Sequence, residues 1–549
     1  MNRVLEKVFP SFKRHARTKS YYSFPEGSTS KSVVFRVKYD GKETICRGRV
    51  VLFFAPTSDP EPRFEAFDLD TLKPLFAKDL LEVKPGDVVE FDSTEFTMPD
   101  ALGFVPNDLS AFTDQLFVQA LFSQNLDDPD PNSCVGNHFS RPVAVSIDPA
   151  TSSNIVDVVA DQVCIQKIET WGSSEITDVV STVIMITETM DLSSNEFLEC
   201  VEMKSELLSE YHQKDVFMYA AVVLPKGYHT RLANTKFPTV YYIEGFTGTE
   251  SYADRARAFL SSEMGDQWKD GSWPVPMLRV TLGSRFKYGH TSFADSEASG
   301  PWGTALVSEF IPFLESKFAM LNESSARFLH GHSSGGWSTL WLQIQNPEFF
   351  GGAWSSAPDP VDFSCFQAVN IYEAKNMYWD PYGRPYPTSR ENGQVTCTMR
   401  DVNLIERVMG NANGGQCDAY NAVFSPIDPL TGLPRPLFDK ISGVVDTDVA
   451  AYWAKFDISK VLENRGVELL NRLAHKLHVV CGSEDSFYLE AACSSLQKLM
   501  GDRPCGHEPT TTNYVAIVPG DHASVRTRAH YQRVYDEIAL AFANSSQQH

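Results

Sequence analysis

The chain has 549 residues, of which 42% are hydrophobic and 21% are charged, and its formal net charge is −22. This composition is typical of a soluble globular protein, and the length predicts two or three domains rather than one core. No apolar run approaches the roughly 18 residues of a transmembrane helix, and the acidic excess repels phosphate backbones. We therefore expect neither a membrane span nor nucleic-acid binding.

The N-terminal 30 residues form a leader that we expect to be poorly ordered. Its first ten residues, Met1 to Pro10, lack the apolar segment of a secretory signal. The 10 cysteines are scattered without a C-x-x-C pair, which indicates reduced core residues rather than a zinc or disulfide framework. Both observations favour a cytoplasmic protein. Basic residues up to Lys19 leave an organelle transit peptide as an alternative, and a lost signal stays open too.

Residues 31–200 contain short β-rich runs separated by turn signals. Strands are predicted at 32–39, 49–54, 87–91, 115–122, 142–146 and 182–187. Because no amphipathic helix separates them, this spacing indicates an all-β, sandwich-like domain. The acidic loop at 127–132 lacks the glycine and closing glutamate of a calcium-binding EF-hand, so we interpret it as a solvated loop.

From residue 201 to 549 the pattern changes to alternating strands and helices. Strands are predicted at 215–225, 237–245, 276–282, 326–330, 352–356, 476–482 and 514–518, and a helix at 304–318. This order predicts a mostly parallel α/β sheet with helices on both faces. A long insertion rich in Tyr, Trp and Pro occupies 358–473, and it is either a lid or binding wall or a structural addition packed on its own aromatic residues.

The most informative stretch is Gly331-His332-Ser333-Ser334-Gly335, which follows a predicted strand and precedes a predicted helix. A Gly-x-Ser-x-Gly turn in this setting is typical of a nucleophile elbow, in which small neighbours allow a strained backbone. The serine hydroxyl then lies above the sheet. The backbone N–H of Ser334 and the helix N-terminus point at any oxyanion that forms there.

A serine nucleophile needs a histidine base and a carboxylate that orients it. In α/β hydrolases the chain order is Ser, then acid, then His, on loops after late strands. Here Glu484 and Asp485 follow one late strand, and His522 follows the last. The sequence therefore predicts a catalytic site of Ser333, His522 and one of these two carboxylates.

With these motifs the chain, from about 207 to 543, resembles the esterase group of α/β hydrolases that includes esterase D, feruloyl esterases and enterochelin esterase. The matching pieces are residues 242–248, 293–296 with 300–303, 331–336, 482–487 and 520–522. The resemblance implies an α/β-hydrolase fold and makes Asp485 the acid, with Glu484 as the alternative. It also favours an oxyanion-hole loop over an ordinary glycine turn at Gly245. In this loop it supports the backbone N–H of Phe246 as the second oxyanion donor, with Thr247 as the near alternative.

We predict a serine carboxylic-ester hydrolase that works through an acyl-enzyme, without metal or organic cofactor, on a small-molecule ester. An acyltransferase with an alcohol acceptor and a catalytically silent binding or scaffold protein stay as alternatives, and a homo-oligomer is compatible with the sequence. Candidates for substrate binding are Glu244, Thr247, His332, Trp337, Tyr372 and Trp379.

Overall fold

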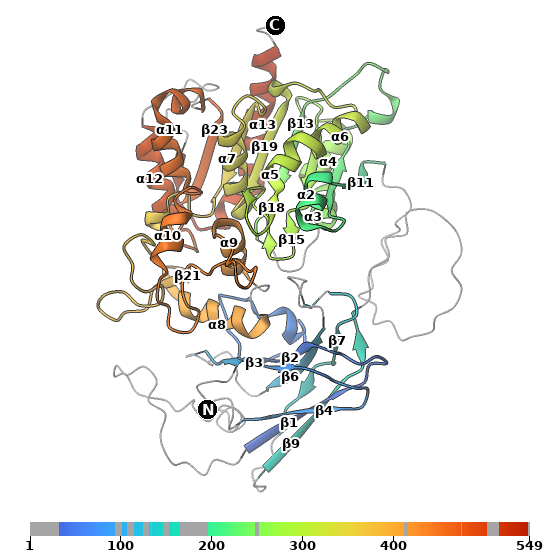
Figure 1. The fold of residues 1–549 in the computed structure, drawn as a ribbon. Helices are drawn as coiled ribbons and strands as arrows, with labels where there is room; N and C mark the ends of the chain where they lie inside the picture. The colour runs from blue at the N-terminus through green and yellow to red at the C-terminus, as the bar shows by residue number, and fades with distance from the viewer. Residues whose placement is uncertain are drawn as a thin grey trace.

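The computed structural model describes most of the 549-residue chain (Figure 1). The described residues are 32–93, 102–106, 115–124, 131–132, 134–146, 153–164, 196–246, 252–410, 415–473, 475–501 and 515–546. The leader 1–30, the predicted strand 182–187 and all but the end of the acidic loop 127–132 lie outside these residues.

The N-terminal part is a β-sandwich, as the sequence predicted. One sheet has the order β4-β1-β9, and the other has the order β10-β7-β6-β2-β3-β5 with β8 beside β6. A core that includes Phe35, Phe54 and Phe122 fills the space between them. The strands are β1 (Ser32–Tyr39), β2 (Gly48–Ala55), β3 (Leu75–Leu80), β4 (Val88–Asp92), β5 (Leu102–Phe104), β6 (Phe117–Ser123), β7 (His138–Phe139), β8 (Val143–Ala144), β9 (Ser153–Ala160) and β10 (Gln162–Val163).

The second part is built on an eight-stranded sheet with the order β11-β12-β14-β13-β19-β20-β23-β24. Strand β12 pairs antiparallel with both of its neighbours, and the pairs from β14 to β24 are parallel. The strands are β11 (Leu198–Lys204), β12 (Phe217–Val223), β13 (Thr239–Ile243), β14 (Leu278–Leu282), β19 (Arg327–His332), β20 (Gly352–Ser356), β23 (Leu477–Gly482) and β24 (Val515–Val518). The predicted α/β-hydrolase fold is confirmed.

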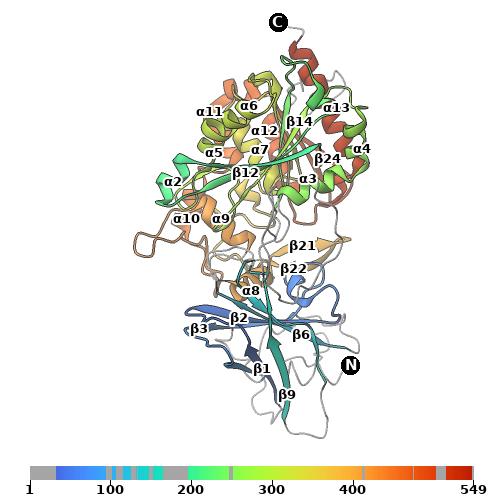
Figure 2. The ribbon, with the colours of Figure 1, turned by 90° about the vertical axis from the view of Figure 1, so that its right-hand side faces the viewer.

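Helices cover both faces of this sheet, and Figure 2 shows it nearly edge-on between them. Helices α3 (Tyr252–Leu260), α4 (Glu263–Asp270) and α13 (Arg528–Ser546) pack on one face through an aromatic-rich core. On the other face lie α5 (Trp302–Ala305), α6 (Ile311–Lys317), α7 (Ser334–Gln345), α11 (Ile458–Leu473) and α12 (Glu490–Met500). The predicted helix 304–318 is thus two helices joined by a π-helical turn, Leu306–Phe310. A short helix, α2 (Glu206–His212), follows β11.

Short two-stranded sheets extend the loops beyond this framework. Their strands are β15 (Arg285–Phe286) with β16 (Gly289–His290), β17 (Asp295–Ser296) with β18 (Gly300–Pro301), and β21 (Pro387–Glu391) with β22 (Gln394–Thr398).

The insertion connects the two parts of the molecule. Besides β21 and β22 it contains α8 (Met399–Met409), α9 (Gln416–Phe424) and α10 (Thr447–Trp453). Ile405, Val408 and Met409 of α8 pack into a core with Val51 and Phe104 of the β-sandwich, and Figure 1 shows α8 between the two parts. One role of the insertion is therefore to anchor the N-terminal β-sandwich.

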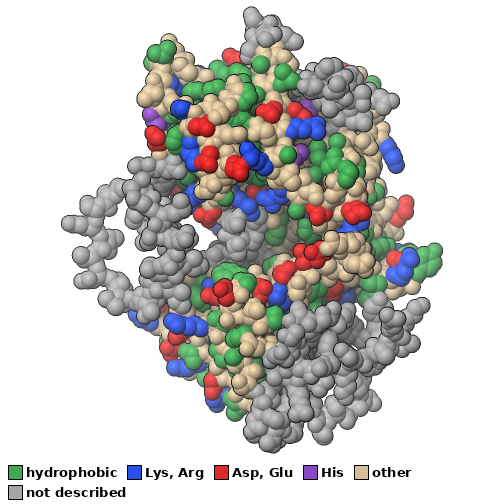
Figure 3. All heavy atoms as spheres, turned by 180° about the vertical axis from the view of Figure 1, so that it is seen from behind, with side chains coloured by type: hydrophobic (Ala, Val, Ile, Leu, Met, Phe, Trp, Pro, Cys, Tyr) green, Lys and Arg blue, Asp and Glu red, His purple; other side chains and the backbone are tan. Residues whose placement is uncertain are grey.

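Acidic and basic side chains are interspersed on the face seen in Figure 3. Over the described residues, no helix combines the length and the apolar character that a membrane crossing needs.

Candidate active site

The turn between β19 and α7 holds Ser333 in a backbone conformation that few residues adopt, with φ 56° and ψ −124°. A Cβ on Gly331 would lie 2.2 Å from the carbonyl oxygen of Gly335, and a Cβ on Gly335 would lie 2.0 Å from that of Ile243. Only glycine fits at either position, because real Cβ atoms do not approach oxygen so closely. The sharp turn lifts Ser333 above the end of β19, which is the geometry of a nucleophile elbow.

An imidazole and a carboxylate meet on the loops after β23 and β24. His522 Nδ1 lies 2.8 Å from Asp485 Oδ2, and the backbone N–H of Phe487 donates to the other oxygen of Asp485 at 2.9 Å. Asp485 is fully buried, and the rings of Phe487 and His332 pack on His522 with centroids 4.9 and 4.4 Å away. This surrounding fixes the imidazole and leaves Asp485 to accept its Nδ1 proton.

The Ser333 hydroxyl faces a carboxylate that the sequence analysis missed. It donates to Asp359 Oδ1 at 3.3 Å, while the Ser334 hydroxyl donates to Oδ2 at 2.5 Å and the Gln416 amide lies 3.4 Å from Oδ1. Asp359 is buried, and this burial raises its pKa. No hydrogen bond joins Ser333 to His522, both of which are among the described residues. The sequence offered only the position of Asp359 shortly after the predicted strand 352–356, which a solvated turn would share.

The loop after β13 approaches the nucleophile closely. A Cβ on Gly245 would lie 2.9 Å from Ser333 Cβ, so the loop that carries the backbone N–H of Phe246 runs beside the serine. Ser334 is the first residue of α7, where backbone N–H groups have no partner within the helix. Thr247, the alternative donor, lies outside the described residues.

A buried histidine, His290, holds this loop through a hydrogen bond to its backbone. His290 Nε2 lies 3.0 Å from the Glu244 carbonyl oxygen, and the Ser292 backbone N–H donates to His290 Nδ1 at 3.0 Å. Since Nδ1 accepts, Nε2 carries the proton and donates to Glu244. Burial lowers the pKa of His290 to about 4, so the ring is neutral near pH 7. The Glu244 carboxylate accepts from the Gly245 backbone N–H at 3.1 Å.

Other residues named from the sequence make mainly packing contacts. Trp337 is buried and stacks on the ring of Trp341 at 5.1 Å. Tyr372 donates to Asp457 at 2.7 Å, and Trp379 packs against the same core as Trp337. The side chain of Glu484, the alternative acid, is exposed. Among the described residues no group of His, Cys, Asp and Glu side chains could hold a metal ion.

Known proteins similar to this chain include esterases. Residues 215–407 match a family model described as "Putative esterase". A solved ferulic acid esterase aligns at 15% identity and a TM-score of 0.39, covering 63% of this chain and 98% of that one. An S-formylglutathione hydrolase from Agrobacterium tumefaciens aligns at 13% identity and 0.34, covering 62% and 95%.

A third solved structure, a feruloyl esterase from Anaeromyces mucronatus in complex with ferulic acid, aligns at 14% identity and a TM-score of 0.30, covering 63% of this chain and 90% of that one. No curated protein matches the chain. The matched residues 215–407 run from near the start of the α/β part into the insertion.

Proposed function

Because residues 215–407 match this esterase family, we propose that the chain is a serine carboxylic-ester hydrolase with Ser333, His522 and Asp485 as its catalytic residues. The observation that carries the proposal is the contact of 2.8 Å between His522 Nδ1 and the buried Asp485, on the loops beside a serine held in an elbow. Such a pair makes the other imidazole nitrogen, Nε2, a base for the serine proton.

In the proposed mechanism the Ser333 hydroxyl turns from Asp359 towards His522 and attacks the ester carbonyl carbon. His522 Nε2 takes the hydroxyl proton and returns it to the leaving alcohol as the C–O bond breaks. The backbone N–H groups of Phe246 and Ser334 hold the negative oxygen of each tetrahedral intermediate. Water then adds to the acyl-enzyme, with His522 acting again as base and acid, and releases the carboxylic acid.

The proposed test is steady-state hydrolysis of 4-nitrophenyl acetate by the wild type and by Ser333→Ala. We expect the variant to lose nearly all turnover, while Ser338→Ala, one helical turn along α7, stays active. Turnover in Ser333→Ala equal to the wild type would refute the assignment. Absence of turnover in the wild type across acetyl, feruloyl and thioester substrates would favour a catalytically silent binding protein.

The same assay tests whether water or an alcohol accepts the acyl group. Transfer to an alcohol uses the same residues, so adding methanol or glycerol and measuring the ratio of ester to acid products separates a hydrolase from an acyltransferase. We expect acid to be the main product.

A further inference from the structure

A cavity of about 430 Å³ lies between the sheet and helices α3, α4 and α13, on the face opposite α7. Its wall includes four arginines, Arg255, Arg279, Arg526 and Arg528, and two glutamates, Glu244 and Glu263. The cavity is therefore basic, although the whole chain carries a net charge of −22. Excess positive charge inside an acidic protein points to a negatively charged ligand.

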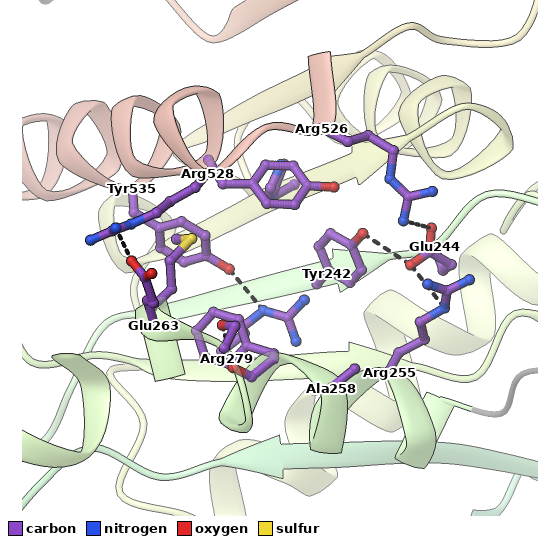
Figure 4. Close-up of a pocket in the computed structure, with 14 residues that line it drawn as sticks. Tyr242, Glu244, Arg255, Ala258, Glu263, Arg279, Arg526, Arg528 and Tyr535 are labelled. Atoms are coloured by element: carbon purple, nitrogen blue, oxygen red, sulfur yellow. Dashed lines mark hydrogen bonds and ion pairs between the residues drawn. The ribbon is translucent and has the colours of Figure 1, made fainter. Parts of the chain in front are cut away.

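Both glutamates form ion pairs with arginines other than Arg279. Glu244 lies 3.3 Å from Arg255 and 3.4 Å from Arg526, and Glu263 pairs with Arg528. Figure 4 shows Glu244 between its two arginines and Arg279 apart from them. The acidic residues of the wall are thus ion-paired without Arg279.

Arg279 is buried, and no carboxylate among the described residues pairs with it. Its side chain donates to the Tyr535 hydroxyl at 2.8 Å and to the Thr281 hydroxyl at 2.6 Å, and its guanidinium lies 4.1 Å from the centre of the Tyr242 ring. Among the described residues no acidic side chain lies within ion-pair distance of Arg279. A buried charge without a counter-ion is costly, so an anion in the cavity would stabilise this arrangement.

A second buried side chain on the same wall, His330, lacks hydrogen-bond partners among the described residues. His330 is 1% exposed and lines the cavity, and neither of its ring nitrogens has a hydrogen-bond partner among the described residues. Its ring contacts Tyr242 and Tyr531 edge-on, with centroids 5.2 and 5.1 Å away. Burial and the nearby Arg279 keep the pKa of His330 well below its usual value. The neutral ring therefore retains one N–H that a ligand oxygen could accept from.

We propose that this cavity binds a small oxyanion, a carboxylate or phosphate group, with Arg279 as its counter-charge and His330 and Arg526 beside it. The guanidinium of Arg279 has N–H groups beyond those given to Tyr535 and Thr281, and a fork of N–H donors matches the oxygens of either group. Stacking on Tyr242 holds the fork in place. Ser333 is not among the residues that line this cavity.

The test is a thermal-shift titration of the full chain with sodium phosphate and, separately, sodium acetate, each against sodium chloride at equal ionic strength. A ligand that binds only the folded state raises the melting temperature in a saturable way. We expect this for phosphate or acetate and not for chloride, and the stronger of the two shows whether the natural ligand carries a phosphate or a carboxylate. A response no greater than that of chloride overturns the proposal.

Arg279→Met should weaken the anion binding seen in the thermal-shift titration on the order of tenfold or more, because it removes the positive charge and the guanidinium N–H donors. Arg533→Gln, at an exposed position on α13, should leave it unchanged. If Arg279→Met does not fold, His330→Phe keeps the ring volume and should weaken binding several-fold. Equal binding by the wild type and the folded cavity variant overturns the proposal. The readout is independent of the ester chemistry, so either proposal can fail alone.

Discussion

Replacing Asp485 with asparagine should remove most of the proposed esterase activity while leaving the shape of the site intact. The Phe487 backbone N–H donates to one side-chain oxygen of Asp485 at 2.9 Å, so the asparagine carbonyl oxygen is expected to face it. The amide NH₂ then faces His522 Nδ1, which lies 2.8 Å from the other oxygen in the wild type. Nδ1 must accept from this amide, and the ring proton moves to Nε2.

A ring with its proton on Nε2 cannot take the proton of Ser333, and the imidazolium that forms during attack loses its buried counter-charge. Changes of this kind in a Ser-His-Asp site lower kcat by about 10³ to 10⁴. Each tenfold loss corresponds to about 1.4 kcal/mol, so the barrier should rise by about 4 to 5.5 kcal/mol. The folded state should be little affected, since the amide keeps the contact with Phe487.

The assay is kcat/KM for an activated acetyl ester, measured for Asp485→Asn, Glu484→Gln and the wild type, with circular dichroism to check folding. Glu484 is adjacent in sequence but exposed, so Glu484→Gln should stay within about twofold of the wild type. Full activity in Asp485→Asn, or loss of activity in Glu484→Gln instead, would rule out Asp485 as the catalytic acid.

Three further predictions concern the stability of the fold. Gly335→Ala places a Cβ 2.0 Å from the Ile243 carbonyl oxygen, so the free energy of unfolding should fall by about 3 kcal/mol or more in urea denaturation. The pKa of His290 is lowered to about 4 in the folded state. Between pH 4 and about 6.5 the unfolded state therefore binds more protons than the folded state. The contribution of neutral His290 to the free energy of unfolding is therefore fully present above pH 6.5 and falls by about 3 kcal/mol as the pH drops towards 4. His290→Asn should flatten this part of the curve of stability against pH. Arg49 donates to two backbone carbonyl oxygens at the end of α8, at 2.8 and 3.0 Å, so Arg49→Gln should cost about 2 kcal/mol and speed proteolysis between the β-sandwich and α8.

Matched variants separate these effects from general damage. Gly410→Ala, where an added Cβ meets no described residue within 4 Å, should leave the stability nearly unchanged. His229→Asn, at an exposed histidine, should keep the wild-type dependence of stability on pH. Arg36→Gln, at an exposed ion pair on β1, should not change the rate of proteolysis. Equal behaviour of a test variant and its control would contradict the corresponding prediction.

Local sequence signals were sufficient for the framework of the α/β part. Strands such as β19 and β23 are short apolar runs that end in polar loops, and parallel strands bring these loops to one edge of the sheet. The order of Ser333, a carboxylate at 484 or 485, and His522 could therefore be read as a candidate site before any contact was known, and the family resemblance favoured Asp485. Their catalytic roles stay predictions that the variants above test.

Contacts made across the fold could not be read in the same way. Asp359 meets Ser333 because β19 and β20 are neighbours and because Gln416 of the insertion closes over it. A single aspartate at the start of an irregular segment gives no local pattern that separates this role from a solvated turn. The basic cavity likewise depends on strands and helices far apart in sequence, from Tyr242 on β13 to Tyr535 on α13.

The packing of the insertion also depends on long-range contacts. Its aromatic residues suggested either a binding wall or a self-packed addition. In the structure Trp453 belongs to the core beside α7 and Tyr372 and Trp379 pack against it, while the apolar face of α8 covers the β-sandwich. The composition of the segment was visible in the sequence, but the two surfaces that it covers were not.

The most direct test of the central claim is to treat the full chain with a fluorophosphonate and map the adduct by peptide mass spectrometry. We expect one stoichiometric adduct, on Ser333, that is absent from Ser333→Ala and strongly slowed in Asp485→Asn. No adduct on the folded protein, or an adduct on another residue, would contradict this claim.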